Sequence, residues 1–455
     1  MRIMRRIFMF GVASAICSGA FAGEPTITTF DDQMYYGGFF PECISANAQY
    51  VSGSTFAWAG FVSEWQKQIN KVYLEEDGSS FENYGCDLPF ITSNGVAIGF
   101  DDLGAMMIDF PNNKITRPRL NDRNINLAAI LPNQMTEDGS IIIGLGYYVE
   151  KKVSNFQSEH SIDNQAAYWE NGECHFLPVP TEEELGYYYL GSRARCISAD
   201  GSVIMGNITD RLNRNPMVIW YRQADGSYLC DPVCDKYFSD VQYNDGKMKE
   251  FATFQGQAMS NDGSKVAMVV RRSPQDGGEN YDAPPQIAMY DTQTRELTVI
   301  PEDPNGIIGW DRTPGFYWTG IANDGTMVGW IDTGLTSFIV YPDEMKPKLL
   351  ADAFDTLGEL ADFDDIGTNK VSSITPDGKY ICGVGWTENA YMGWYVGYVL
   401  DTGIEPGESS VAVIEKAPEG TPEYYSISGQ RLDAPVKGIN IVRYPDGSSR
   451  KEIKN

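Results

Sequence analysis

The segment Ile197-Ser-Ala-Asp-Gly-Ser-Val-Ile-Met-Gly206 places an Asp-Gly pair between two apolar runs. Asp-Gly and Asn-Gly are preferred at the centre of a type I′ turn, because both central residues of that turn need a positive φ angle. The segment therefore predicts a β-hairpin, with one short strand on each side of Asp200-Gly201. A further glycine, Gly206, follows the second apolar run.

The same pattern occurs seven times along the chain. Each copy has Ile or Met three residues before an Asp or Asn, and Gly follows that Asp or Asn in six of the seven. The positions are Asn47, Asn94, Asp138, Asp200, Asp262, Asp324 and Asp377, with a mean separation of 55 residues. The fifth copy departs from the pattern, since Met268 stands where most copies have the later glycine.

Each copy continues beyond the hairpin. A third apolar segment follows and ends at Trp65, Phe110, Trp169, Trp220, Tyr290 or Tyr341, with Leu400 in the last copy. A polar turn and a fourth apolar segment come next, which gives four antiparallel strands per copy. Repeats of this length and strand content are typical of propeller blades.

We therefore expect an all-β fold, a seven-bladed β-propeller of four-stranded antiparallel blades over residues 23–403. The segment Thr26–Phe30 is expected to close the ring. A β-sandwich or a series of small sheets is the alternative.

Two kinds of known repeat resemble these units. The segment Ile197–Gly206, followed by a strand that ends in Trp, is similar to the extracellular HAF-type repeat, and Ser373-Ile-Thr-Pro-Asp-Gly-Lys-Tyr-Ile381 resembles the TolB/WD40-like repeat. The resemblance covers most of residues 40–402. It implies the propeller fold and specifies no chemistry.

The two ends of the chain differ from the repeats. Residues 1–22 read as a signal peptide, with Arg2, Arg5 and Arg6 before an apolar run and Ala20-Phe21-Ala22 at its end. Residues 404–423 read as a linker. Residues 424–455 predict a small C-terminal β-hairpin tail, which resembles the end of type IX secretion sorting tails. The resemblance implies association with the outer membrane or cell surface; a plain terminal hairpin packed on the propeller is the alternative.

Composition limits the function classes. The chain has 35 Lys and Arg against 62 Asp and Glu, for a net charge of −27, so a nucleic-acid partner is not expected. No segment after the signal peptide is long and apolar enough to span a bilayer. An exported protein in the periplasm, at the cell surface or outside the cell is expected. The cysteines are expected to be buried thiols with at most one disulfide, and no metal or cofactor is predicted.

Binding is expected where loop length varies. In a propeller, the connections between second and third strands and those between blades share one face, and the Asp-Gly turns mark the opposite face. Aromatic rings beside charged groups suit sugar recognition, because sugar faces stack while hydroxyls take hydrogen bonds. The candidate ligand-binding residues are Tyr187, Tyr188, Tyr189, Arg193, Arg195, Tyr281, Trp310, Asp311, Arg312, Trp318, Asp364, Asp365 and Trp386. The alternative is that most of these aromatics pack between blades.

The sequence favours an exported binding module for a glycan or a protein. Alternatives are a polysaccharide hydrolase or lyase that uses loop carboxylates, and a structural adhesin or envelope component. No catalytic residue is assigned: there is no Gly-x-Ser-x-Gly motif, and only His160 of the two histidines is expected on the variable face. Buried carboxylates that converge on a central funnel would favour the enzyme, whereas an exposed aromatic patch would favour binding.

Overall fold

The computed structural model describes two units of the chain separately, one within Ala22–Ser409 and one that includes the C-terminal residues from Ser410. The described residues are 25–30, 38–55, 59–73, 87–101, 104–117, 127–148, 165–180, 189–210, 216–231, 251–272, 285–300, 316–331, 336–354, 370–386, 395–404, 423–425, 431–432, 438–443 and 449–454. They contain no helix with the length and apolarity that a membrane crossing requires.

The first unit consists of seven four-stranded antiparallel sheets, so the predicted number of blades and of strands per blade is confirmed. Blades one to three are β2 (Phe39–Ile44), β3 (Val51–Thr55), β4 (Gly60–Glu64) and β5 (Ile69–Tyr73); β6 (Asp87–Ile91), β7 (Val96–Asp101), β8 (Gly104–Asp109) and β9 (Lys114–Thr116); and β10 (Leu127–Met135), β11 (Ile141–Tyr148), β12 (Gln165–Glu170) and β13 (Glu173–Phe176). Blades four to six are β14 (Tyr189–Ile197), β15 (Val203–Asp210), β16 (Met217–Arg222) and β17 (Tyr228–Asp231); β18 (Phe251–Met259), β19 (Lys265–Arg272), β20 (Gln286–Asp291) and β21 (Glu296–Val299); and β22 (Phe316–Ile321), β23 (Met327–Ile331), β24 (Thr336–Val340) and β25 (Pro347–Leu349). The described residues also include two short helices, η1 (Trp65–Lys67) and α3 (Leu350–Ala353).

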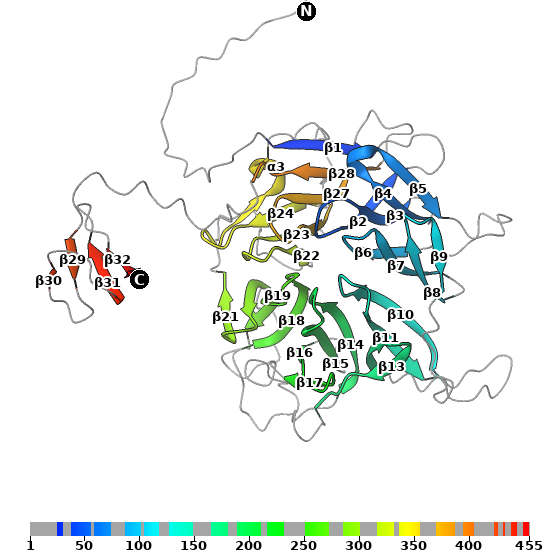
Figure 1. Ribbon diagram of the computed structural model, residues 1–455, viewed down its shortest axis with the longest axis horizontal. Helices are drawn as coiled ribbons and strands as arrows, with labels where there is room; N and C mark the ends of the chain where they lie inside the picture. The colour runs from blue at the N-terminus through cyan, green and yellow to red at the C-terminus, as the bar shows by residue number, and fades with distance from the viewer. Residues whose placement is uncertain are drawn as a thin grey trace, which may run out of the picture. The chain divides into compact units, whose positions relative to one another are not determined.

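The seventh blade joins the two ends of the propeller. Its strands are β26 (Lys370–Ile374), β27 (Tyr380–Trp386), β28 (Tyr395–Asp401) and, outermost, β1 (Thr26–Phe30). Thr26 pairs with Asp401 and Phe30 with Gly397, which confirms Thr26–Phe30 as the closing strand. The first strand of each blade contacts the first strands of both neighbouring blades, so β2, β6, β10, β14, β18, β22 and β26 surround the centre (Figure 1).

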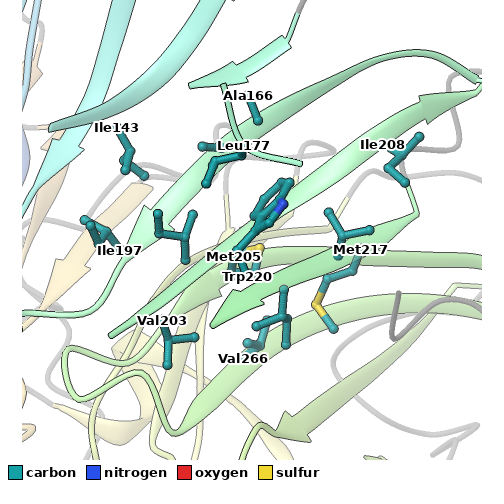
Figure 2. Close-up of a cluster of buried hydrophobic side chains, with 14 of the residues drawn as sticks. Ile143, Ala166, Leu177, Ile197, Val203, Met205, Ile208, Met217, Trp220 and Val266 are labelled. Carbon is teal, nitrogen blue, oxygen red and sulfur yellow. The ribbon is translucent and has the colours of Figure 1, made fainter. Parts of the chain in front are cut away.

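The hydrophobic core lies between the faces of adjacent blades. Trp220, on the third strand of blade four, is fully buried among residues of blades three to five (Figure 2). Its indole N–H donates to the carbonyl oxygen of Pro178, just after blade three. A predicted strand-ending aromatic therefore holds one blade against the blade before it.

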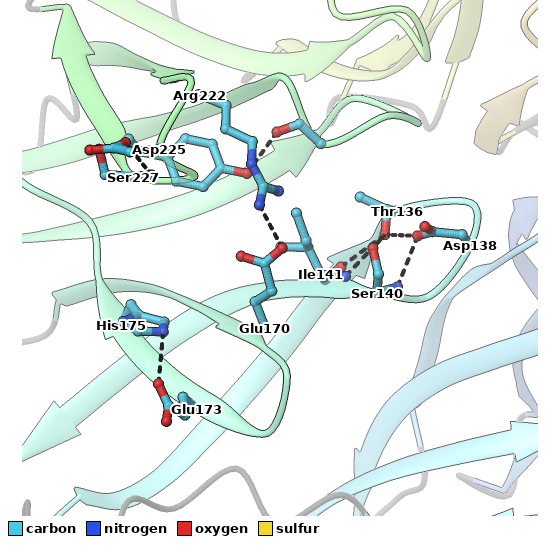
Figure 3. A network of polar contacts seen from close by, with 12 residues as sticks. Thr136, Asp138, Ser140, Ile141, Glu170, Glu173, His175, Arg222, Asp225 and Ser227 are labelled. Atoms are coloured by element: carbon cyan, nitrogen blue, oxygen red, sulfur yellow. Dashed lines mark hydrogen bonds and ion pairs between the residues drawn. The ribbon is translucent and has the colours of Figure 1, made fainter.

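The repeated turns differ from the predicted type I′ geometry. In the turn at Asp138, only Gly139 has a positive φ, 70°. The Asp138 carboxylate instead accepts hydrogen bonds from the Thr136 hydroxyl at 2.7 Å and from the Ser140 N–H at 2.9 Å (Figure 3). The loop between the two strands is longer than two residues, because the Thr136 N–H bonds the Ile141 carbonyl; within the loop the Gly139 N–H bonds the Thr136 carbonyl. The Asp is selected as a hydrogen-bond acceptor rather than for its backbone conformation.

Every first strand carries a β-bulge, and the later glycine of the repeat lies opposite it. In blade four the pairing shifts between Ala194 and Cys196, with Gly206 opposite Ala194. A Cβ atom at Gly206 would stand 2.1 Å from the Arg193 carbonyl oxygen. The bulge thus brings the two backbones too close for a side chain.

Met268, which stands in blade five where most repeats have the later glycine, is matched by a glycine on the partner strand. Met268 pairs with Gly256, beside the bulge of blade five. A Cβ atom at Gly256 would stand 2.6 Å from the Met217 sulfur. In this blade the glycine is on the first strand and the larger residue is on the second.

The second unit contains one antiparallel sheet, of strand order β30-β29-β31-β32. Its strands are β29 (Glu423–Tyr425), β30 (Arg431–Leu432), β31 (Gly438–Arg443) and β32 (Ser449–Lys454). The predicted hairpin is present as β31 and β32, and two shorter strands extend it. Most of the predicted linker, 404–423, lies outside the described residues.

Candidate functional site

A cavity of about 210 Å³ occupies the centre of the ring, and all seven first strands line it. It extends from the bulges toward the Asp-Gly turns. We call that end of the propeller the turn end. The opposite end, where strands two and three and successive blades are connected, is the variable end.

The bulge contributes one cavity-lining residue from each blade, always five positions before the repeated Asp or Asn. Six of the seven are polar or charged. The set is Glu42, Pro89, Asn133, Arg195, Gln257, Thr319 and Ser372.

Several of these side chains tie neighbouring blades together. The Asn133 amide donates to the Ala194 carbonyl at 2.8 Å, and the Gln257 side-chain oxygen accepts from the Trp318 N–H at 2.7 Å. Thr319 makes an equivalent bond to the backbone of blade seven. These three side chains therefore hydrogen-bond to backbone groups in the first strand of the next blade, which the bulge of that strand leaves available.

Glu42 is a cavity-lining carboxyl with a raised pKa. Burial, and after it the charge of Asp87 and a hydrogen bond with Asp87, together raise the pKa of Glu42 to about 8, against smaller lowering effects of Ser54 and Lys370. The Ser54 hydroxyl donates to Glu42 Oε1 at 3.2 Å. At neutral pH Glu42 is therefore mostly protonated, and the proton is held in the hydrogen bond with Asp87.

Arg195 brings a positive charge to the cavity from blade four. Burial lowers the pKa of Arg195, and the nearby Arg193 lowers it further. Arg193 itself is exposed, and its guanidinium donates to Asn133 Oδ1 at 3.4 Å. Two like charges therefore lie on one strand beside the cavity.

An aromatic patch lies at the variable end of blades six and seven. The Tyr317 and Trp330 rings are stacked, with centroids 4.5 Å apart and planes at 17°. Tyr317 is 41% exposed, and the exposed Lys370 places its ammonium 5.0 Å from the centre of the Trp330 ring. We call these three residues the Tyr317 patch.

The structure describes only some of the candidate residues named from the sequence. Those outside the described residues are Tyr187, Tyr188, Tyr281, Trp310, Asp311, Arg312, Asp364 and Asp365, together with His160. Tyr189 and Trp386 are end residues of β14 and β27, at the variable end.

Three candidates are described with their side chains. Arg193 and Arg195 belong to the strand β14 rather than to a loop as expected, because β14 extends over nine residues through its bulge. Trp318 is 4% exposed, and its indole N–H donates to the Met268 carbonyl at 2.9 Å. Trp318 therefore packs between blades, which is the alternative to a ligand-binding role.

Glu42, Trp330 and Lys370 do not stand out in the sequence, and Tyr317 does so only as one of several aromatics near the variable connections. A sequence signal for the bulge ring is present in the repeats, since a polar or charged residue stands five positions before the repeated Asp or Asn in six of the seven copies. The stacking of Tyr317 on Trp330 depends on strand register, because the two residues are 13 positions apart and pair directly across β22 and β23.

The other residues of types that often serve in catalysis or metal binding are His175 and the cysteines of the described segments. His175 lies on the fourth strand of blade three, as expected, and stacks on Tyr168 with ring centroids 4.9 Å apart. Cys43, Cys196 and Cys382, in the described segments, are free thiols. Within the same segments no three His, Cys, Asp or Glu side chains are grouped to hold a metal ion.

Comparisons with known proteins found only distant structural similarities. No family model and no curated protein matches the sequence. An oligogalacturonate lyase from Vibrio parahaemolyticus is 12% identical, with 83% of this chain and 97% of that chain covered and a TM-score of 0.46. A puromycin-hydrolyzing peptidase of Mycobacterium tuberculosis is 11% identical, covering 90% and 61% at a TM-score of 0.46. The Cps50 (Swd1) β-propeller domain of Myceliophteria thermophila is 9% identical, covering 82% and 98% at 0.42. At such identities no activity follows for this chain.

Proposed function

We propose that the protein is an exported binding module that recognises a glycan at or beyond the cell surface through the variable end of its propeller. The Tyr317 patch carries the proposal. It presents an exposed tyrosine ring backed by a tryptophan, with an ammonium group beside them. A sugar stacks its apolar face on such a ring and gives its hydroxyls to neighbouring donors.

The surroundings of the patch support this assignment. Tyr317 and Lys370 lie at the beginning of β22 and β26, and Trp330 lies near the end of β23. These strand ends meet the connections whose length varies most among blades. Binding sites are common in variable connections on a rigid scaffold.

A glycan array probed with residues 23–455 tests the proposal, with Tyr317→Ala as the test variant. Leu229→Ala is the matched control, because Leu229 is 62% exposed on the outermost strand of blade four. We expect a specific glycan signal from the unmodified protein and L229A that falls at least tenfold in Y317A. Equal signals from Y317A and L229A would show that the Tyr317 patch does not bind the glycan. Binding to a protein without any glycan signal would show that the ligand is not a glycan.

One observation favours a second candidate function, a polysaccharide hydrolase or lyase. Glu42 is a protonated carboxyl at neutral pH on the wall of the central cavity, and Asp87 is its neighbour. A carboxyl with a raised pKa can donate a proton to a leaving oxygen. Release of reducing ends from a polysaccharide panel by the unmodified protein, abolished in Glu42→Gln, would establish this function in place of binding alone.

A further inference from the structure

The central cavity is a built polar site, separate from the Tyr317 patch. Seven strands contribute to its wall, and each supplies its bulge residue there. Bonds such as Asn133 to Ala194 and Gln257 to Trp318 fix the ring between blades. A rigid wall of this kind binds a small ligand without an ordering cost.

We propose that this cavity is a second binding site, for a small hydroxylated carboxylate held by the Arg195 guanidinium. Arg195 lines the cavity and is partly buried there. The planar guanidinium matches a carboxylate with two parallel hydrogen bonds.

Arg195 favours an anion with hydroxyl groups, while Glu137, which also lines the cavity, accepts a hydrogen bond from the Ser93 N–H at 2.8 Å. Arg193 is close enough to Arg195 to lower its pKa, so an anion bound at Arg195 relieves the repulsion between the two cations. Glu42 adds an uncharged carboxyl to the wall from blade one, hydrogen-bonded to Asp87. Thr319 and Ser372 add hydroxyls from blades six and seven.

The cavity volume sets the ligand size. Sites for drug-sized ligands usually measure about 300–1,000 Å³. The cavity here, of about 210 Å³, suits a molecule of a few carbon atoms. A hydroxy acid fits this volume, whereas an oligosaccharide exceeds it.

Calorimetric titration with L-tartrate tests the site, and L-threitol is the control ligand, since it keeps the carbon chain and hydroxyls but lacks the carboxylates. Arg195→Gln is the test variant. Arg295→Gln is the matched variant, because it removes the same charge from a side chain that is 63% exposed. A thermal melt of each variant confirms folding.

We expect tartrate to bind the unmodified protein and R295Q, at least tenfold more weakly to R195Q, and threitol not to bind. Retained binding in R195Q, equal binding of threitol, or no binding of tartrate would each overturn the proposal. Tighter binding of inorganic phosphate than of tartrate would overturn the carboxylate assignment. Tartrate binding by Y317A is expected to be unchanged, which separates this site from the proposed glycan site.

Discussion

Glu42 of blade one and Asp87 of blade two form a hydrogen-bonded carboxyl pair between neighbouring first strands of the propeller. The pair lies at the bulge of β2, where Glu42 is the extra residue between Pro41 and Cys43. It joins two features of the molecule, the contact between blades and the wall of the central cavity.

This pair predicts a loss of stability as pH rises. The folded-state pKa of Glu42, about 8, lies above the ordinary value of 4.5, so the folded protein keeps a proton that the unfolded chain releases. Stability from this group is complete below pH 4.5 and is lost as pH rises toward 8. Glu42→Gln cannot ionise, and its amide can still donate to Asp87. We expect E42Q to gain on the order of 2 kcal/mol relative to the unmodified protein between pH 5 and pH 8.

Urea unfolding at both pH values measures this change. Glu344→Gln is the control, because Glu344 forms an exposed pair with Lys348 at 2.7 Å. A stability difference between E42Q and the unmodified protein that does not grow with pH would contradict the assignment.

Gly206 is expected to tolerate no side chain. In Gly206→Ala the new methyl group meets the Arg193 carbonyl, with a 2.1 Å approach in the unmodified backbone, so the bulge of blade four has to move. We expect a loss of about 3 kcal/mol in the free energy of unfolding. Gly146→Ala is the comparison, because its nearest neighbour is a side-chain atom of Phe176 at 3.0 Å, which can shift. Equal losses in the two variants would show that the close approach at the bulge is not the cause.

The Asp138 turn is expected to weaken in acid. Hydrogen bonds from the Thr136 hydroxyl and from Ser140 lower the pKa of Asp138 below its ordinary value. The ionised carboxylate therefore stabilises the folded state above its unfolded pKa, and this contribution disappears as pH falls through the folded pKa. Asp138→Ala is expected to cost about 1 kcal/mol at pH 7, because solvent screens this exposed turn. In urea unfolding the cost should shrink at acidic pH, whereas a constant cost would contradict the charge effect.

Loss of a partly buried ion pair between blades three and four is expected to lower the free energy of unfolding more than loss of a surface ion pair. Arg222 donates to Glu170 at 2.6 Å, and both side chains are about three-quarters buried (Figure 3). Arg295 pairs with Asp231 at 2.8 Å but is 63% exposed. We expect Arg222→Met to lower the free energy of unfolding by about 2 kcal/mol and Arg295→Met by less than about 1 kcal/mol. The reverse order in urea unfolding would refute the role of burial.

The repeats were sufficient to predict the propeller because their period, turns and apolar runs are local features. The repeats do not indicate which strand closes the ring, and the pairing of Thr26–Phe30 with β28 shows that it is this segment. The turn type was wrong, because Asp138 acts through its side chain and the sequence Asp-Gly does not distinguish the two geometries.

The candidate site was less accessible to sequence reasoning. Arg195 was selected for its charge in an expected loop, but its place in the cavity depends on the bulge at Ala194 and Cys196. The meeting of Glu42 with Asp87 requires two blades in register, and that of Trp330 with Lys370 requires two other neighbouring blades. Such contacts arise from the closed ring, which no single repeat encodes.

The most direct measurement is the dissociation constant of the strongest array glycan for Y317A and L229A, determined by calorimetry on folded protein. Removal of the Tyr317 ring should weaken binding at least tenfold, while L229A should bind like the unmodified protein. Equal affinities of Y317A and the unmodified protein would contradict glycan recognition at the variable end of blades six and seven.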